Sequence, residues 1–150
     1  MAQVAATFEV PNGWEKFEWE GTLGGVRHLA VSGDFRPNVL VTLDKWPGQV
    51  GAQQADEILG EQLVAAGAEV TERETFAEPR PGVEIATLQR DEAGASVRVR
   101  YRVQLLEAGA DTLVLTAVAT YLLEQADGVE GDVTRILRSV DLTASATRDA

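Results

Sequence analysis

The pattern of hydrophobic and polar residues is most regular between residues 97 and 105. Apolar and polar side chains alternate there with the two-residue period of a β-strand whose two faces differ. The apolar positions are Val97, Val99, Tyr101, Val103 and Leu105, and the polar positions between them are Arg98, Arg100, Arg102 and Gln104. This segment is predicted to be the middle strand of a three-stranded antiparallel meander over residues 83–123.

Two short turns set the register of this meander. A three-residue turn over 92–94 joins its first two strands, and another over 108–110 joins the middle strand to the last. The predicted pairs are Val83 with Val103, Ile85 with Tyr101, Glu84 with Arg102, Leu105 with Leu113, and Val103 with Leu115. A slip by one residue would set valines against arginines, so the alternation itself selects the register. One buried face is then expected to hold Val83, Ile85, Val99, Tyr101, Val103 and Leu115.

Two other segments show helical periodicity, and the helices they predict could cover this sheet. The face with the arginines also carries Ala86, Leu88, Val114 and Val118 by the same pairing, so both faces need cover. Residues 51–66 place an apolar stripe at helical spacing, and Gly67 suits a left-handed helix end. A second helix, ending near residue 142, is predicted to begin at a capping box of Asp127 and Glu130. It is expected to bury Val129, Val133, Ile136, Leu137 and Val140.

The remaining segments add strands to the sheet. Short β-patterns cover 7–10, 26–32, 39–46 and 69–75, and proline and glycine turns separate them. The prediction is a single α+β domain over residues 1–142, with an antiparallel β-sheet of about six strands and helices packed on its faces. Residues 143–150 are predicted to form a flexible C-terminal tail.

Composition limits the classes of function. The 150 residues suit one domain, and the absence of cysteine excludes disulfides, a cysteine nucleophile and thiolate metal sites. The formal charge of −11 repels phosphate backbones, so nucleic-acid binding is not expected. No stretch reaches the length of about 18 apolar residues that a membrane span needs, and no leader pattern opens the chain. A cytoplasmic protein without membrane insertion is therefore expected, with the cell envelope as the alternative location if a leader has been removed.

Catalytic and metal chemistry find little support in the residues. His28 is the only histidine, and it lies in a predicted strand without the nucleophile motif that a catalytic triad requires. The carboxylates of 127–132 could suggest a calcium loop, but they lack the ligand run and closing glutamate of an EF-hand. The capping box accounts for them instead. We therefore predict no catalytic residue, no metal site and no cofactor.

Three short segments resemble a known family. They are Phe8-Glu9-Val10-Pro11-Asn12-Gly13-Trp14, Pro37-Asn38-Val39-Leu40-Val41 and Ile136-Leu137-Arg138-Ser139-Val140. With the order of the predicted elements, they resemble the PsbP-like α/β/α sandwich group, nearest to the LpqN-type bacterial lipoprotein family. The resemblance implies a non-enzymatic adaptor, chaperone or accessory protein without shared catalytic residues. The chain lacks the leader and anchoring cysteine of LpqN-type lipoproteins, which favours a cytoplasmic relative such as the chaperones of secreted effectors.

Three arginines are the best candidates for binding a ligand. Arg98, Arg100 and Arg102 share one face of one strand, and guanidinium groups bind carboxylates or phosphates through paired hydrogen bonds. The simpler interpretation is that they pair with Glu84 and with carboxylates of a covering helix. If they do bind a ligand, the protein is a small-molecule carrier or enzyme. It would then have a closed, mostly apolar cavity between sheet and helix.

Two tryptophans support a different function. Trp19 and Trp46 stand beside charged residues and glycines, so at least one is expected to be exposed, whereas Trp14 is expected to pack inward. Aromatic side chains commonly anchor protein interfaces. The leading hypothesis is a non-catalytic binding or accessory protein, adaptor or chaperone-like, that recognises another polypeptide. Such a protein should show an exposed apolar patch or an open sheet edge.

Overall fold

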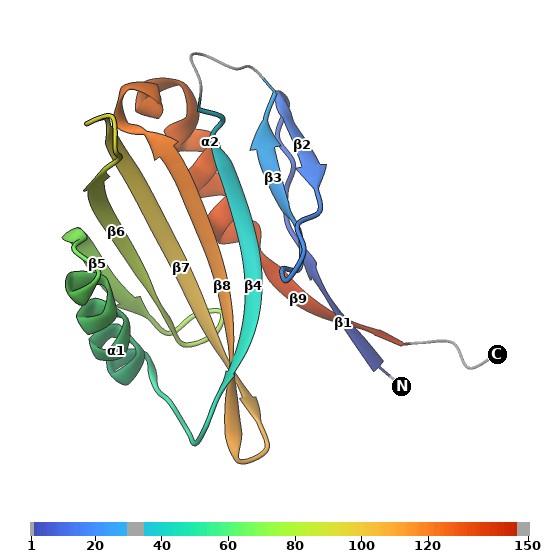
Figure 1. Cartoon of the computed structure of the whole chain (residues 1–150). Helices are drawn as coiled ribbons and strands as arrows, with labels where there is room; N and C mark the ends of the chain where they lie inside the picture. Colours follow the sequence, from blue (N-terminus) through green and yellow to red (C-terminus); the bar gives the residue numbers. More distant parts are fainter. Residues whose placement is uncertain (1, 30–34, 147–150) are drawn as a thin grey trace.

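The computed structural model describes residues 2–29 and 35–146, which form an antiparallel sheet covered by helices (Figure 1). Within these residues the elements are β1 (Ala2–Thr7), β2 (Trp14–Phe17), β3 (Gly25–His28), β4 (Asn38–Trp46), α1 (Ala52–Ala65), β5 (Glu69–Phe76), β6 (Gly82–Arg90), β7 (Ser96–Ala108), β8 (Asp111–Leu122), the 3₁₀ helix η1 (Leu123–Gln125), α2 (Ala126–Ser139) and β9 (Asp141–Ala146). The main sheet has the order β2-β3-β4-β8-β7-β6-β5, and β1 and β9 form a separate pair. The predicted α+β class is confirmed, with seven strands in the main sheet.

The first hairpin of the predicted meander has the expected register. β6 and β7 pair antiparallel, with Val83 opposite Val103, Glu84 opposite Arg102 and Ile85 opposite Tyr101. Because β7 alternates strictly, a slip by one residue would set charged side chains against the valines, and this explains why the register could be predicted.

The second hairpin is one residue out of the predicted register. Gly109 and Ala110 alone form its turn, because Ala108 pairs directly with Asp111, and Gly109 has a positive φ of 65°. Leu105 therefore lies opposite Val114, and the predicted pairing of Val103 with Leu115 is wrong. Since the side-chain period of a strand is two, this shift moves Leu115 to the face of the arginines.

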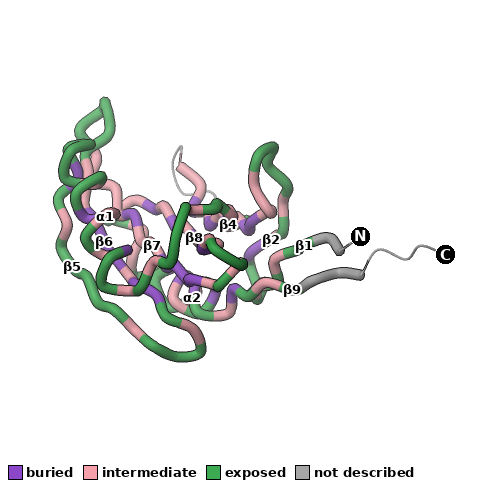
Figure 2. Tube along the Cα trace, turned by 90° about the horizontal axis from the view of Figure 1, so that it is seen from below, coloured by how far each residue is buried: buried purple, intermediate pink, exposed green. Residues whose placement is uncertain are grey.

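The two faces of the sheet carry separate cores. The α1 face, which α1 covers, has a core of Ala55, Val83, Ile85, Val103, Leu105 and Val114. The α2 face is covered by α2, which lies across β8 and contacts β4 and β7 as well (Figure 2). The core on this face is the larger one. That core contains Trp14, Val26, Val39, Val41, Leu115, Ala117, Ala119, Tyr121, Val129, Val133, Ile136, Leu137 and Val140.

Helix α2 has the predicted buried face but a different start, and it ends at Ser139 instead of near residue 142. All five residues expected to be buried are buried, including Val140 just after the helix. The predicted capping box is wrong, because η1 leads directly into a helix that begins at Ala126 and so places Asp127 inside its first turn. The Glu130 carboxylate instead accepts a hydrogen bond from the Tyr121 hydroxyl at 3.4 Å. The Gln125 side chain joins the helix start to the Leu122 N–H and the Phe35 carbonyl.

The two ends of the described chain pair with each other. β1 lies at residues 2–7 rather than at the predicted 7–10, and its antiparallel partner is β9. Residues 143–146 correct the predicted tail, because they extend β9 and satisfy the backbone of β1. The rest of the predicted tail, 147–150, and part of the predicted strand 26–32 lie outside the described residues.

Candidate functional site

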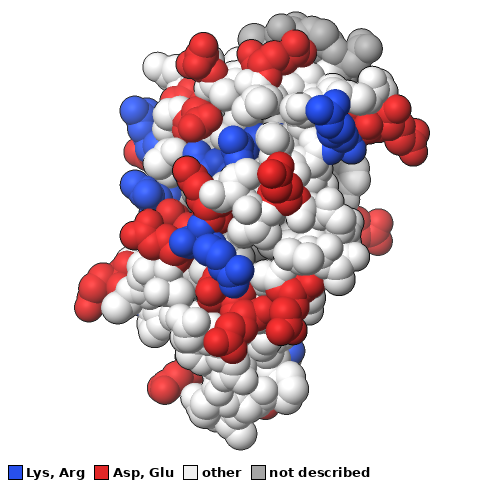
Figure 3. All heavy atoms as spheres, turned by 90° about the vertical axis from the view of Figure 1, so that its left-hand side faces the viewer, with Lys and Arg blue, Asp and Glu red and all other residues white. Residues whose placement is uncertain are grey.

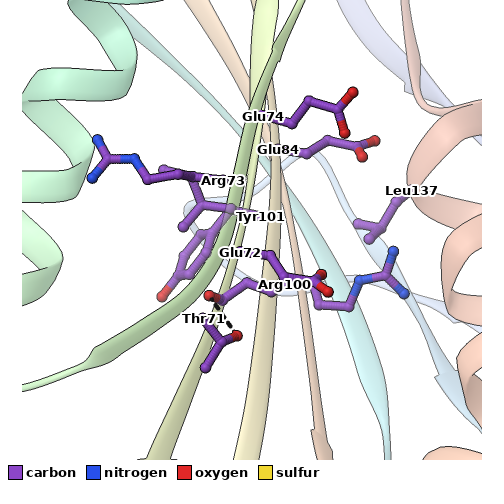
Figure 4. A pocket seen from close by; sticks show the side chains of 10 residues that line it. Thr71, Glu72, Arg73, Glu74, Glu84, Arg100, Tyr101 and Leu137 are labelled. Atoms are coloured by element: carbon purple, nitrogen blue, oxygen red, sulfur yellow. Dashed lines mark hydrogen bonds between the residues drawn. The ribbon is translucent and has the colours of Figure 1, made fainter.

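A hollow of about 520 Å³ lies on the α2 face, between α2 and the strands β5, β6 and β7 (Figure 4). We call it the arginine groove. Its lining residues are Thr71, Glu72, Arg73, Glu74, Glu84, Ile85, Ala86, Arg100, Tyr101 and Leu137. The groove exists because α2 packs across β8 and its two neighbours β4 and β7, and leaves β6 and β5 less covered. Its floor contains Ala86, whose small side chain is buried.

Cross-strand pairing places charged side chains in rows across the groove. Glu72 on β5, Ala86 on β6 and Arg100 on β7 form one row of directly paired residues. Because paired residues point to the same face, their side chains share the groove. Figure 4 shows Glu72, Glu74, Glu84 and Arg100 on the side of α2, whereas Arg73 and Tyr101 point away. The groove is therefore lined by both carboxylates and guanidinium groups.

Arg102 is held inside the protein by Glu84. Its guanidinium pairs with the Glu84 carboxylate and lies 4.1 Å from the centre of the Phe76 ring. Arg138 of α2 reaches the same carboxylate at 3.4 Å. Burial alone would raise the pKa of Glu84, but hydrogen bonds from Arg138 and Arg102 hold it below its ordinary value. For Arg102, the predicted pairing with Glu84 is confirmed.

Arg98 and Arg100 have hydroxyl partners instead. Arg98 donates to Thr71 Oγ1 at 2.7 Å, and Arg100 donates to Thr134 Oγ1 of α2 at 2.8 Å. Among the described residues, no carboxylate lies within 4.0 Å of either guanidinium. Pairing with helix carboxylates is therefore wrong for these two arginines. Their charge acts on buried Tyr121, whose pKa is raised by burial and by Glu130 and lowered less by Arg100.

The two candidate tryptophans lie in different surroundings. Trp19 is 61% exposed in the β2–β3 connection, with the Phe17 ring 6.4 Å away. Trp46 is half-buried and packs against the core of the α1 face. The structure thus does not join them into one surface. Trp14 packs inward as predicted, and its ring meets that of His28 edge-on at 5.1 Å.

The open edge of β5 forms the rim of the groove. β5 is the last strand of the main sheet, and among the described residues it pairs only with β6. Most of its residues are exposed, as Figure 2 shows at the margin of the molecule. The strand itself is predicted from the sequence, but its place at the edge is not. The alternating glutamates of this segment were the available signal, because charged side chains typify edge strands.

A second hollow, of about 510 Å³, lies on the other side of β5 against α1. Its lining residues are Glu57, Gly60, Glu61, Val64, Ala65 and Arg73. Arg73 crosses to α1, where its Nε lies 2.9 Å from Asp56 Oδ1. This hydrogen bond raises the pKa of Arg73. Figure 3 shows this flank of the molecule, with many acidic groups and fewer basic groups between them.

A third hollow, of about 680 Å³, lies where β4 runs into α1. Val50, Pro81, Leu105 and Leu106 give it a more apolar lining than the arginine groove has. Arg98, Arg100 and Arg102 are not among its lining residues. The apolar hollow and the candidate arginines are thus in different places.

Comparisons with known proteins identify the fold. The structure resembles LpqN, a protein involved in cell envelope biogenesis of Mycobacterium tuberculosis, with a TM-score of 0.76 and 13% identity over 97% of this chain and 86% of that one. It also resembles the Ran-binding protein Mog1p of Saccharomyces cerevisiae, with a TM-score of 0.54 and 10% identity over 94% of this chain and 95% of that one. No family model and no curated protein sequence matches the chain. The resemblance in fold predicted from the sequence is confirmed.

The described residues contain neither a membrane-spanning helix nor a group of metal ligands. None of the helices in the described part of the chain combines the length and the apolar character needed to cross a bilayer. In the same residues, no three or more histidine, aspartate or glutamate side chains are grouped as metal ligands would be.

Proposed function

We propose that the protein is a non-catalytic accessory protein that recognises another polypeptide. A segment of that partner adds as a further strand to the open edge of β5. An extended segment can add to an exposed sheet edge, where backbone hydrogen bonds give affinity and flanking pockets give specificity. The observation that carries the proposal is the exposed β5 edge between two hollows. The absence of catalysis and the cytoplasmic location stay predictions.

The similar structures support a role in binding without specifying it. Mog1p is a Ran-binding protein, and LpqN is involved in cell envelope biogenesis. At such low sequence identity, the two structures support only a binding role in general. The choice of the β5 edge rests on the structure of this chain alone.

The alternative hypothesis, a small-molecule carrier or enzyme anchored by Arg98, Arg100 or Arg102, is less favoured. A carrier cavity is mostly apolar with a few convergent polar groups. The arginine groove is instead lined largely by charged side chains, and exposed residues of β5 form its rim. Arg102 is in addition already paired with Glu84.

Site-specific photo-crosslinking in the native cell tests the proposal. A photoreactive amino acid replaces Glu74 on β5, and a matched variant carries it at Lys16, an exposed charged position on the opposite edge strand β2. We expect a discrete protein adduct from position 74 and none from position 16. Trp19→Ala, combined with the probe at position 74, should leave that adduct unchanged if the β5 edge is the primary contact. Adducts only from position 16, or equal labelling from both edges, would contradict the proposal.

A further inference from the structure

The surroundings of β5 restrict which segment can bind there. In an added strand, successive side chains point to opposite faces of the sheet. One set would enter the arginine groove, and the other set would enter the hollow against α1. The chemistry of these two hollows therefore describes the partner segment position by position.

The groove side of β5 presents carboxylates. Glu69, Glu72 and Glu74 pair with Leu88, Ala86 and Glu84, so all three lie on the α2 face. Glu72 and Glu74 are exposed, and among the described residues no cation lies within 4.0 Å of either carboxylate. The Glu84 charge beyond them is already neutralised by Arg102 and Arg138. A side chain that reaches the groove from a strand added to β5 meets Glu72 and Glu74 first.

The α1 side offers an apolar surface with acidic margins. Val64 is 63% exposed, although it belongs to a helix that covers the sheet. Glu57 and Glu61 line the same hollow, while Arg73 is held by Asp56. This hollow suits an apolar side chain. It also suits a lysine whose aliphatic stem lies on the apolar surface and whose charge reaches the acidic margin.

A second copy of this chain does not suit the edge. Antiparallel pairing of two β5 strands keeps groove-side residues opposite groove-side residues, so Glu72 and Glu74 would face carboxylates of the other copy. Like charges directly opposite each other destabilise a strand pair. The net charge of −11 adds a long-range repulsion between copies.

From these contacts we infer that the segment bound at β5 is a basic strand, with lysine or arginine at alternate positions opposite Glu72 and Glu74 and apolar residues between them against Val64. The inference rests on the proposed function and specifies its partner. It distinguishes a binding edge from an edge whose glutamates only prevent aggregation, because such an edge would not discriminate between basic sequences of equal charge.

Three synthetic peptides of equal length test the inference on the full chain. One alternates lysine with valine, one contains the same residues with the lysines grouped, and one alternates glutamate with valine. We expect the alternating lysine peptide to bind at least about tenfold more tightly than either of the others in fluorescence anisotropy. Its affinity should fall as salt is added, because the contacts are exposed.

A matched pair of variants locates the binding. Glu72→Lys/Glu74→Lys reverses the groove-side charge, and Glu18→Lys/Glu20→Lys makes the same charge change at exposed positions beside β2. We expect only the first variant to lose the alternating lysine peptide, with circular dichroism showing both folded. Equal binding of the alternating and grouped lysine peptides, or equal loss in both variants, would overturn the inference as nonspecific charge attraction. A preference for the glutamate peptide would also overturn it. Adducts from position 74 would still support the proposed function in these cases.

Discussion

The two helices have the same length of 14 residues but meet the sheet in different ways. Helix α2 buries Val129, Val133, Ile136 and Leu137, which recur at the spacing of one helical stripe. Helix α1 buries only Ala55 and Gly60 fully, and its Val64 remains largely exposed. α2 thus closes the central part of its face, whereas α1 lies shallowly near the β5 edge. We interpret the α2 side as the structural half and the β5 flank as the half available for binding.

The largest expected effect is a difference in the free energy of unfolding between a variant in α2 and a variant in α1. Ile136→Ala should lower the free energy of unfolding by about 2–5 kcal/mol, because it opens a cavity under α2. Val64→Ala on α1 should change it by less than about 0.5 kcal/mol, as exposed substitutions do. Chemical denaturation measures both. Similar small losses in the two variants would mean that α2 is peripheral and would remove the contrast.

The next effect concerns Glu84. Among the described residues it is the only carboxylate of the arginine groove that pairs with two arginines. Glu84→Gln should destabilise the fold by about 1–3 kcal/mol, because it leaves the guanidinium of Arg102 buried without its counter-charge. Glu74→Gln, a neighbouring exposed glutamate, should stay within about 0.5 kcal/mol. If both variants unfold at the same denaturant concentration as the original protein, Arg102 does not depend on Glu84.

The same carboxylate predicts a pH dependence. Its pKa is lower in the folded than in the unfolded protein, so protonation favours unfolding. The stability that Glu84 contributes is present above its ordinary pKa near 4.5 and is lost as the pH falls through the lowered value. The gap in unfolding free energy between the original protein and Glu84→Gln should therefore narrow on acidification below that pH. A gap that stays constant from neutral to strongly acidic pH would contradict this assignment.

The smallest effect compares a glycine in each helix. A Cβ at Gly131 of α2 meets nothing within 4 Å, so Gly131→Ala should stabilise the protein by up to about 1 kcal/mol through helix propensity. A Cβ at Gly60 of α1 would lie 2.6 Å from Arg73 Nη2, and Arg73 would have to move from Asp56. Gly60→Ala should therefore gain less than Gly131→Ala in thermal unfolding. An equal gain in the two variants would show that the contact of Arg73 with α1 contributes nothing to the stability of the protein.

The accuracy of the sequence predictions follows the strength of the local pattern. The β6–β7 register could be predicted because β7 alternates strictly, so that a slip by one residue would set valines against arginines. The β7–β8 register could not, since the turn at Gly109 can hold two or three residues and both faces of β8 are partly apolar. The pairing of β1 with β9 joins opposite ends of the chain, and no local pattern contains that information.

The candidate site was predictable only in part for the same reason. The alternation placed Arg98, Arg100 and Arg102 on one face, but their partners come from α2 and β5 as well as from the neighbouring strand. Glu72 and Glu74 are candidate binding residues only because β5 is an edge strand, which the sequence did not predict. Side-chain alternation predicts which face a residue shares, whereas the order of strands decides which edge remains open.

Amide hydrogen exchange tests most directly the central claim that a partner segment adds to β5. The measurement compares the protein alone with its complex with the partner captured through position 74. We predict slower exchange within residues 69–76 of β5, with the amides of residues 14–17 on the opposite edge unchanged. Slower exchange at β2 with none at β5 would contradict the account, as would a complex in which β5 exchanges as fast as in the free protein.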